Sequence, residues 1–275
     1  MSRIALFQST TGIDPAANAR ALEDAIAEAA AGGAEMLFTP EMSGLLDRDS
    51  ARAAKSLTDE DENTALAKCR EAARKHHIWL HLGSLAVLVE DGKVANRGFV
   101  IDREGEVRAR YDKIHLFDVD LPTGESWRES NVYSAGKGVV LVNGTPVGRL
   151  GLTICYDLRF PGLFARLAEA DADVIAVPAA FTVPTGKAHW HILLRARAIE
   201  AVLFVFAAAQ VGRHEDGRQT FGHSLVVDPW GEVVLDMGEK PGVGFADVDL
   251  KRISDVRGRI PALSHRRPIP DAMTL

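Results

Sequence analysis

Hydrophobic positions recur along the chain with two spacings, one typical of strands and one typical of helices. An apolar run at residues 3–8 predicts a strand, and the alanine-rich segment 15–31 has the composition and spacing of a helix. Asp14 stands before this helix as an N-cap, and Gly32 and Gly33 end it. Further helices are expected at 60–76, 161–170 and 187–201, and further strands at 35–39, 78–88, 94–101, 106–112, 173–177, 203–209, 223–227, 232–236 and 243–248.

The order of these elements predicts an α/β fold. Strands alternate with helices, and turn residues at 90–92 and 103–105 indicate hairpins between neighbouring strands. A mixture of βα units and hairpins favours helices layered on mixed sheets. No linker rich in Ser, Gly or Pro and no repeat of fixed period divides the chain, so we expect a single domain over residues 1–275.

Composition and charge narrow the possible functions. The formal net charge of −6 and the isoelectric point near 5.9 argue against nonspecific binding of nucleic acid. No apolar stretch approaches the roughly 20 residues that cross a bilayer, and the N-terminal apolar run is too short for a signal peptide. Two cysteines offer little basis for a disulfide framework. We therefore expect a cytoplasmic protein that binds neither nucleic acid nor membrane.

One cysteine stands where a nucleophile is expected. The segment 151–161, GLTICYDLRFP, is an apolar run that delivers Cys155 to a polar turn just before a predicted helix. A thiol at such a strand-to-helix turn faces solvent at the carboxyl end of a sheet, and neighbouring backbone N–H groups can stabilise an oxyanion. A lone cysteine in an apolar run is also a common core residue. That second interpretation is the one we adopt for Cys69, which lies in a helical segment.

A carboxylate and an ammonium group occupy comparable positions. Glu41 follows the apolar run 36–38, and Lys113 follows another strand-like run. Each would ordinarily be a solvated surface charge. In this chain order and these local contexts, Glu41, Lys113 and Cys155 resemble the Glu, Lys and Cys of the nitrilase superfamily of carbon–nitrogen hydrolases.

The resemblance extends over nearly the whole chain, from residues 4–8 through 226–231 to 266–268. Within the superfamily the chain is most similar to the Nit branch, which includes omega-amidase and deaminated glutathione amidase. The segments that carry this similarity are 115–122, 188–190, 194–200 and 207–214. The last two of them are more similar to deaminated glutathione amidase than to omega-amidase.

The resemblance implies a fold and an assembly. Members of the superfamily are four-layer αββα sandwiches in which two sheets face each other. They form dimers or higher homo-oligomers by packing helices across a two-fold axis. Their reaction requires no metal and no organic cofactor.

The resemblance also implies a mechanism. Cys155 would attack the amide carbonyl carbon while Glu41 takes the thiol proton and returns it to the leaving nitrogen. Lys113 and the backbone N–H of Tyr156 would stabilise the tetrahedral oxyanion. Glu41 would then activate a water that hydrolyses the thioester.

A second glutamate is expected near the thiol. Glu129 occupies the place where family members carry another active-site glutamate, which would position Lys113 or help to manage protons. Glu125 lies in the same loop and is the rival candidate for this position.

Three residues are expected to bind substrate. In Nit relatives the residue that matches Arg159 contacts the carboxylate of acidic amides, and those that match Phe181 and Thr185 line the same pocket. A guanidinium group suits a carboxylate because its fork donates two parallel hydrogen bonds. The alternative for Arg159 is a structural ion pair with Asp157 or another neighbour.

The nine histidines suggest no metal site. Neither the group His76, His77 and His81 nor the pair His189 and His191 has acidic or sulfur partners at the spacing of a metal-binding motif. We expect no metal and no cofactor.

These inferences lead to an expected function. The chain is expected to be an amidase that hydrolyses a small linear amide carrying a carboxylate to acid and ammonia. Deaminated glutathione is the preferred substrate and alpha-ketoglutaramate the next. A nitrilase and an N-carbamoyl amino acid amidohydrolase stay open, because the same three catalytic residues serve all of these reactions. A binding protein without turnover is disfavoured by the intact Glu41, Lys113 and Cys155.

Overall fold

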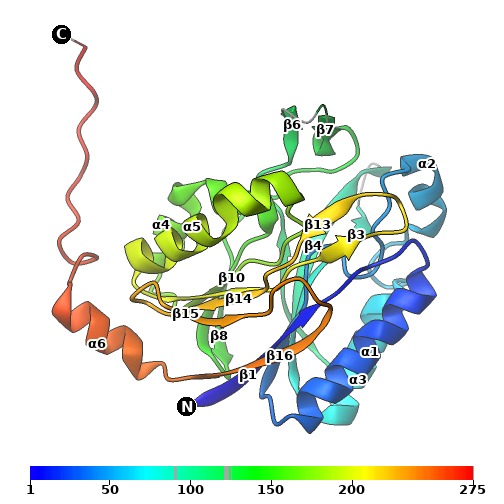
Figure 1. Ribbon diagram of the computed structural model, residues 1–275, viewed down its shortest axis with the longest axis horizontal. Helices are drawn as coiled ribbons and strands as arrows, with labels where there is room; N and C mark the ends of the chain where they lie inside the picture. Colours follow the sequence, from blue (N-terminus) through cyan, green and yellow to red (C-terminus); the bar gives the residue numbers. More distant parts are fainter. Residues whose placement is uncertain (90–91, 121–123, 125, 275) are drawn as a thin grey trace.

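Two six-stranded sheets lie face to face between two layers of helices (Figure 1). This computed structural model describes residues 1–89, 92–120, 124 and 126–274. The predicted four-layer αββα sandwich is thereby confirmed. The segment after α6 extends away from the sandwich (Figure 1).

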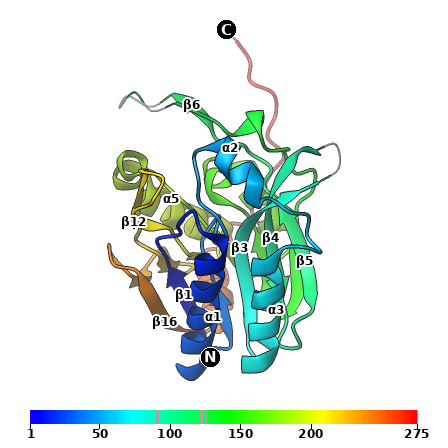
Figure 2. The ribbon, with the colours of Figure 1, turned by 90° about the vertical axis from the view of Figure 1, so that its right-hand side faces the viewer.

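The first sheet carries α1 (Pro15–Ala31) and α3 (Thr64–His76) on its outer face, and these helices run side by side (Figure 2). Successive side chains of a strand alternate between its two faces, so Ala5 packs under the helices while Ile4 and Leu6 face the other sheet. The strand order is β16 (Gly242–Val248), β1 (Ser2–Gln8), β2 (Met36–Phe38), β3 (Trp79–Leu88), β4 (Val94–Ile101) and β5 (Val107–Asp112).

The second sheet is covered by α4 (Pro161–Glu169) and α5 (Val183–Ala201). The short helix α6 (Lys251–Arg259) packs at its end, where Arg257 donates hydrogen bonds to the carbonyl oxygens of Val202 and Ala172. The strand order is β15 (Val233–Asp236), β14 (Leu225–Val227), β11 (Phe204–Ala207), β10 (Val174–Ala176), β9 (Gly148–Leu152) and β8 (Leu141–Thr145).

Most predicted elements are present with shifted ends. The predicted helix 60–76 begins only at Thr64, because the side chain of Asn63 accepts a hydrogen bond from the N–H of Leu66 and caps it there. The predicted helix 187–201 begins earlier, at Val183, with Pro184 in its first turn, a position where a missing N–H costs no hydrogen bond. The turn at 103–105 connects β4 and β5 as expected. Residues 90 and 91 of the other predicted turn lie outside the described residues.

Several short elements were not predicted. Most of them span only three to five residues and show no clear hydrophobic period, whereas α6 has nine residues, of which only Ile253 and Val256 are buried. Besides β8 and α6, they are α2 (Ser50–Ala53), β6 (Asp118–Asp120), β7 (Ser126–Arg128), β12 (Val211–Arg213) and β13 (Gln219–Phe221). Among the described residues, no helix is both long enough and apolar enough to cross a membrane.

Candidate active site

Glu41, Lys113 and Cys155 lie together although they come from different strands and different sheets. Glu41 follows β2 and Lys113 follows β5 in the first sheet, while Cys155 follows β9 in the second. Lys113 Nζ lies 2.9 Å from Glu41 Oε1, and the Cys155 thiol lies close enough to the Glu41 carboxylate for each group to shift the pKa of the other. The structure thus brings the three predicted residues into one contact group at the ends of three strands.

The loop after β2 is held against β3, and this places Glu41. The N–H of Met42 donates to Ser84 Oγ at 2.9 Å, and the N–H of Ser43 donates to the carbonyl oxygen of Ser84 at 3.0 Å. Gly83 allows this approach, because a Cβ at that position would lie 2.1 Å from the carbonyl oxygen of Thr39. A side chain at residue 83 would therefore push the loop that carries Glu41 away from β3.

Cys155 occupies a strained turn that is held in place by a backbone hydrogen bond. Its φ is 48°, an uncommon value for a residue other than glycine, and its N–H donates to the carbonyl oxygen of Pro178 at 2.8 Å. The residue begins a 3₁₀ turn, Cys155–Arg159, that ends before α4. A thiol at a strand-to-helix turn is expected to face solvent, but only 8% of Cys155 is exposed.

Asp157 organises this turn from within the protein. Its fully buried carboxylate accepts hydrogen bonds from the hydroxyl of Tyr111 at 2.7 Å, from the backbone N–H of Ile154 at 2.9 Å and from the backbone N–H of His115 at 3.0 Å. The ring of His115 contacts the same carboxylate at 2.7 Å. The ion pair between Asp157 and Arg159 that the sequence left open is therefore not formed, because other donors occupy this carboxylate.

The ammonium group of Lys113 is shared by two glutamates. Lys113 Nζ lies 2.9 Å from Glu129 Oε2 and 3.2 Å from Glu129 Oε1, in addition to its contact with Glu41. Asn96 Nδ2 bridges the same two carboxylates, at 2.9 Å from Glu41 Oε1 and 3.1 Å from Glu129 Oε1. Glu129 thus reaches the site as the sequence predicts, whereas the rival Glu125 lies outside the described residues.

Backbone groups complete the solvation of these carboxylates. The N–H of Ala180 donates to Glu41 Oε2 at 3.0 Å, and the N–H of Phe117 donates to Glu129 Oε2 at 2.6 Å. Sequence reasoning missed both donors and also missed Asn96. The only signal for Asn96 was its polar side chain inside the apolar strand 94–101. In the structure Asn96 is almost fully buried.

The charges of the site set the protonation states of its members. Burial alone would raise the pKa of Glu41, but the Lys113 ammonium and hydrogen bonds from Cys155, Lys113 and Asn96 lower it below the ordinary value. Burial and the adjacent negative charge of Glu41 raise the pKa of the Cys155 thiol well above its ordinary value, despite Lys113 nearby. Burial disfavours the charged form of Lys113, but Glu129 and Glu41 outweigh it and raise its pKa. The site therefore holds a neutral thiol beside an ionised carboxylate.

A cavity opens above the thiol. Its volume of about 480 Å³ is typical of small-molecule sites. Its wall includes the predicted residues Tyr156, Arg159, Phe181 and Thr185. The guanidinium group of Arg159 lies over the ring of Phe181, 5.5 Å from its centre. Its two terminal nitrogens form long hydrogen bonds with His189 Nδ1, at 3.4 Å and 3.3 Å. Arg159 forms no ion pair with any described carboxylate, so it can accept an anionic ligand.

Residues 3–258 match the carbon–nitrogen hydrolase family. The chain belongs to this family and is a hydrolase that acts on carbon–nitrogen bonds other than peptide bonds. The resemblance to the nitrilase superfamily and to its Nit branch is thereby confirmed.

Individual relatives are similar over almost the whole chain. The deaminated glutathione amidase of Yersinia enterocolitica is 39% identical over 272 residues, which cover 97% of this chain and 93% of the relative. The crystal structure of the Caenorhabditis elegans NitFhit protein gives a TM-score of 0.89 at 41% identity, covering 97% of this chain and 65% of that protein. The chain therefore spans less than two thirds of NitFhit.

A third similar structure is that of a mutant of the amidase from Nesterenkonia sp. AN1. It gives a TM-score of 0.81 at 27% identity and covers 97% of this chain and 94% of that one. In that structure the acetamide moiety of fluoroacetamide is covalently added to the active-site cysteine.

The arrangement predicts that Cys155 ionises only at high pH. Because burial and Glu41 raise its pKa, the neutral thiol persists to a higher pH than a free thiol, whose pKa is 9.0. The ultraviolet absorbance of the thiolate, taken as the difference between the wild type and Cys155→Ala during a pH titration, should therefore rise only well above pH 9.0. The subtraction removes Cys69, whose pKa burial raises to about 12. A midpoint below about pH 7 would instead indicate a preformed thiolate.

Proposed function

We propose that this hydrolase is a thiol amidase that cleaves a small linear amide carrying a carboxylate, with deaminated glutathione as the preferred substrate. The observation that carries the proposal is the Cys155 thiol beside an ionised Glu41, below a cavity whose wall holds the guanidinium group of Arg159, which forms no ion pair with any described carboxylate. The name of the Yersinia relative supports the choice of substrate.

The first half of the reaction forms a thioester. As Cys155 Sγ bonds to the carbonyl carbon, its proton passes to Glu41, so a thiolate never has to be stored beside that carboxylate. Collapse of the tetrahedral intermediate breaks the carbon–nitrogen bond, and Glu41 returns the proton to the nitrogen. The released amine is ammonia for a primary amide and a larger amine for a substituted one such as deaminated glutathione.

The oxyanion requires positive charge or N–H donors at the moment it forms. In the proposed mechanism Lys113 Nζ and the backbone N–H of Tyr156 provide them. Glu129 acts as a positioning residue, because both of its carboxylate oxygens contact Lys113 Nζ and neither needs to touch the substrate. Its second contact, to the N–H of Phe117, fixes the carboxylate in turn.

The second half regenerates the thiol. A water enters after the amine has left, Glu41 removes one of its protons, and the hydroxide equivalent attacks the thioester carbonyl. The carboxylic acid then leaves as Sγ takes back the proton from Glu41. No group outside the chain is needed to balance either half of the reaction.

Substrate selection is assigned to the upper wall of the cavity. Arg159 would bind the carboxylate of the acyl part, while Phe181 and Thr185 contact its carbon chain. Tyr156 and Phe181 both lie under the Arg159 guanidinium group, at 5.9 Å and 5.5 Å from the ring centres, and they hold it over the cavity.

We also propose that the chain works in the cytoplasm as a single domain, assembled into a homodimer or a higher homo-oligomer. A free thiol at Cys155 fits a reducing compartment. One outer face is formed by α5, by β15 and by the turn before β15. It exposes large apolar side chains that a second copy would cover. They are Ile192 (70% exposed), Ile199 (50%), Trp230 (46%), Val233 (41%) and Val234 (48%).

Substitution of the nucleophile tests the reaction class. Cys155→Ala should lower kcat at least about 10⁴-fold while leaving the fold intact, because no other group can form the thioester. Cys69→Ala is the matched control and should retain most activity, since Cys69 is buried in α3. Purified enzyme is incubated with amides, nitriles and N-carbamoyl amino acids, and the acid and amine products are measured by mass spectrometry.

The outcomes of that panel separate the alternatives. Turnover of deaminated glutathione in preference to alpha-ketoglutaramate supports the proposal, and the reverse preference assigns the enzyme as an omega-amidase. Turnover of nitriles or N-carbamoyl amino acids but not of amides refutes the amidase assignment. An acyl adduct found on Cys69 rather than on Cys155 refutes the assigned nucleophile.

Arg159→Leu tests recognition of the carboxylate. It should raise KM for deaminated glutathione about 10-fold to 100-fold, because a hydrogen-bonded charge pair contributes about 1.5–3 kcal/mol. A short neutral amide never uses this contact and should lose much less. The measurement is kcat/KM for both substrates in both proteins, and equal losses would show that Arg159 has only a structural role.

Ile192→Asp tests the proposed assembly. A charge at this exposed position of α5 should convert the oligomer to monomers in sedimentation experiments, because its burial between two copies would be unfavourable. Ile269→Asp is the matched control, since Ile269 is 92% exposed on the C-terminal segment. A wild type that sediments as a monomer would exclude the dimer.

A further inference from the structure

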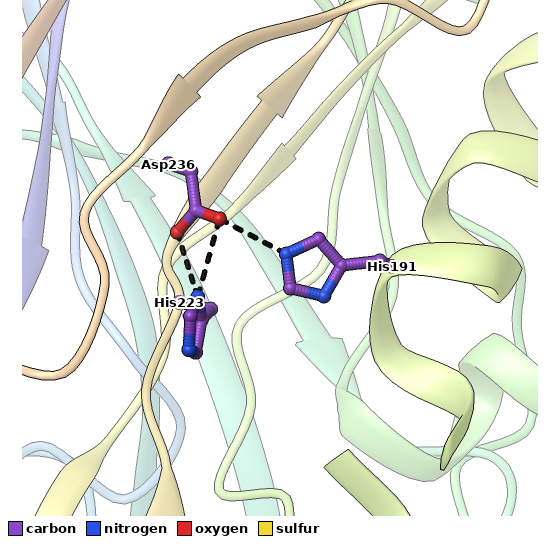
Figure 3. Close-up of side chains that lie close together, drawn as sticks. All are labelled: His191, His223 and Asp236. Atoms are coloured by element: carbon purple, nitrogen blue, oxygen red, sulfur yellow. Dashed lines mark hydrogen bonds and ion pairs between the residues drawn. The ribbon is translucent and has the colours of Figure 1, made fainter. Parts of the chain in front are cut away.

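Two histidines and an aspartate converge on the outer side of the second sheet. Figure 3 shows His191 reaching from α5 toward Asp236, which ends β15, and His223, which lies between β13 and β14, pointing at the same carboxylate. His191 Nε2 lies 3.0 Å from Asp236 Oδ2, and His223 Nδ1 lies 2.9 Å from Asp236 Oδ1. One ligand atom from each residue lies within 4.8 Å of those of the other two.

We propose that His191, His223 and Asp236 form a binding site for a divalent transition metal, with Zn²⁺ as the best-fitting ion. Two imidazoles and one carboxylate are donors that Zn²⁺ accepts, and three protein ligands leave the fourth tetrahedral position to water. The side chains are 20–35% exposed, so a metal ion and that water can reach them.

The observed distances are close to those that such a site needs. Ligand atoms at about 2.0–2.1 Å from a tetrahedral ion lie about 3.3 Å from one another. The three contacts between ring nitrogens and Asp236 are about 0.1 to 0.4 Å shorter: His191 Nε2 lies 3.0 Å from Oδ2, and His223 Nδ1 lies 2.9 Å from Oδ1 and 3.2 Å from Oδ2. A small retreat of the carboxylate therefore makes room for the ion, and coordination bonds replace the hydrogen bonds between the rings and Asp236.

The surroundings fix two of the ligands. The N–H of Gly238 donates to Asp236 Oδ1 at 2.9 Å, which orients the carboxylate. The backbone of His223 is held at both ends, because its N–H donates to the carbonyl oxygen of Gly238 and its own carbonyl oxygen accepts from Trp190 Nε1, each at 2.8 Å. Its φ of 54° is an uncommon value that these two bonds stabilise.

The charge of the cluster also suits a cation. Across the part of the chain that the structure describes, the ion pairs of Asp236 are with His191 and His223 alone, and neither lysine nor arginine competes for the carboxylate. Neutral imidazoles and an ionised carboxylate are the forms that bind a metal ion, so the three ligands together carry one negative charge when they coordinate it.

The site is structural and separate from the reaction centre. None of its three ligands lines the cavity above Cys155. It would connect α5 to the β14–β15 hairpin, two segments that also present the exposed apolar face. His189, two residues before His191 on α5, contacts Arg159, so a fixed α5 also holds one wall of the cavity.

This inference departs from the expectation of no metal. Metal-binding motifs that a sequence reveals have ligands at short spacing, whereas these ligands come from residues 191, 223 and 236. Only the pairing of β14 with β15 and the packing of α5 over them bring these three together.

Equilibrium dialysis of the full-length, tag-free protein against Zn²⁺ tests the proposal. The Cys155→Ala background is used, so that the nucleophile cannot supply a thiolate ligand. One Zn²⁺ per chain should bind, and the ion should raise the Tm by about 3 to 8 °C when it is present at 100 times its Kd. His191→Gln should weaken binding at least about 100-fold, while His265→Gln, at an exposed histidine outside the cluster, should bind as the parent does.

Two further measurements keep the result decisive. His223→Asn is a second ligand variant, chosen because asparagine tolerates a positive φ, and circular dichroism without metal shows whether each variant folds. Co²⁺ bound in place of Zn²⁺ should give the visible spectrum of a tetrahedral site with nitrogen and oxygen ligands and no thiolate band. Absence of binding at about 0.1 mM Zn²⁺, or equal binding by His191→Gln, would leave the cluster as a hydrogen-bonded triplet and overturn the proposal.

Discussion

The site depends on one buried ammonium group held between a buried carboxylate and a partly buried one. Lys113 is 2% exposed, and the side chains of Glu41 and Glu129 are 6% and 12% exposed. Removing these charges from water is costly unless each of them is paired and hydrogen-bonded. Each carboxylate oxygen of the two glutamates has at least one donor from Lys113, Asn96 or a backbone N–H. One negative charge is left over, and it disfavours a second one on the neighbouring sulfur.

This requirement explains why the site sits at strand ends in a sandwich. Strand ends leave backbone N–H groups free of the sheet, and Ala180 and Phe117 direct theirs at the glutamates. The rigid sheets hold groups from remote parts of the chain within hydrogen-bonding distance, since Glu41 and Ala180 are 139 residues apart. A fold in which a single loop carried the whole site could not exclude water from it as completely.

The sequence reveals what each strand end carries but not how the ends meet. Glu41, Lys113 and Cys155 each follow an apolar run, and their order resembles a known superfamily, so the fold and these residues could be predicted. Asn96 and Asp157 could not, because their roles depend on partners 33 to 55 residues away in one case and 42 to 46 in the other. The convergence of His191 with Asp236 has the same origin, since sheet pairing rather than spacing creates it.

The protonated state of Cys155 has a consequence for survival of the enzyme under oxidative stress. Peroxides attack thiolates far faster than thiols, so the rate of sulfenic acid formation follows the fraction of ionised sulfur. A cysteine activated by a permanently low pKa would be lost to such oxidants between turnovers. In the proposed reaction Glu41 withdraws the proton only as the sulfur bonds to a carbonyl carbon, which a peroxide lacks. Under this proposal the carboxylate that activates Cys155 during turnover also keeps its thiol protonated, and so less reactive toward peroxides, between turnovers.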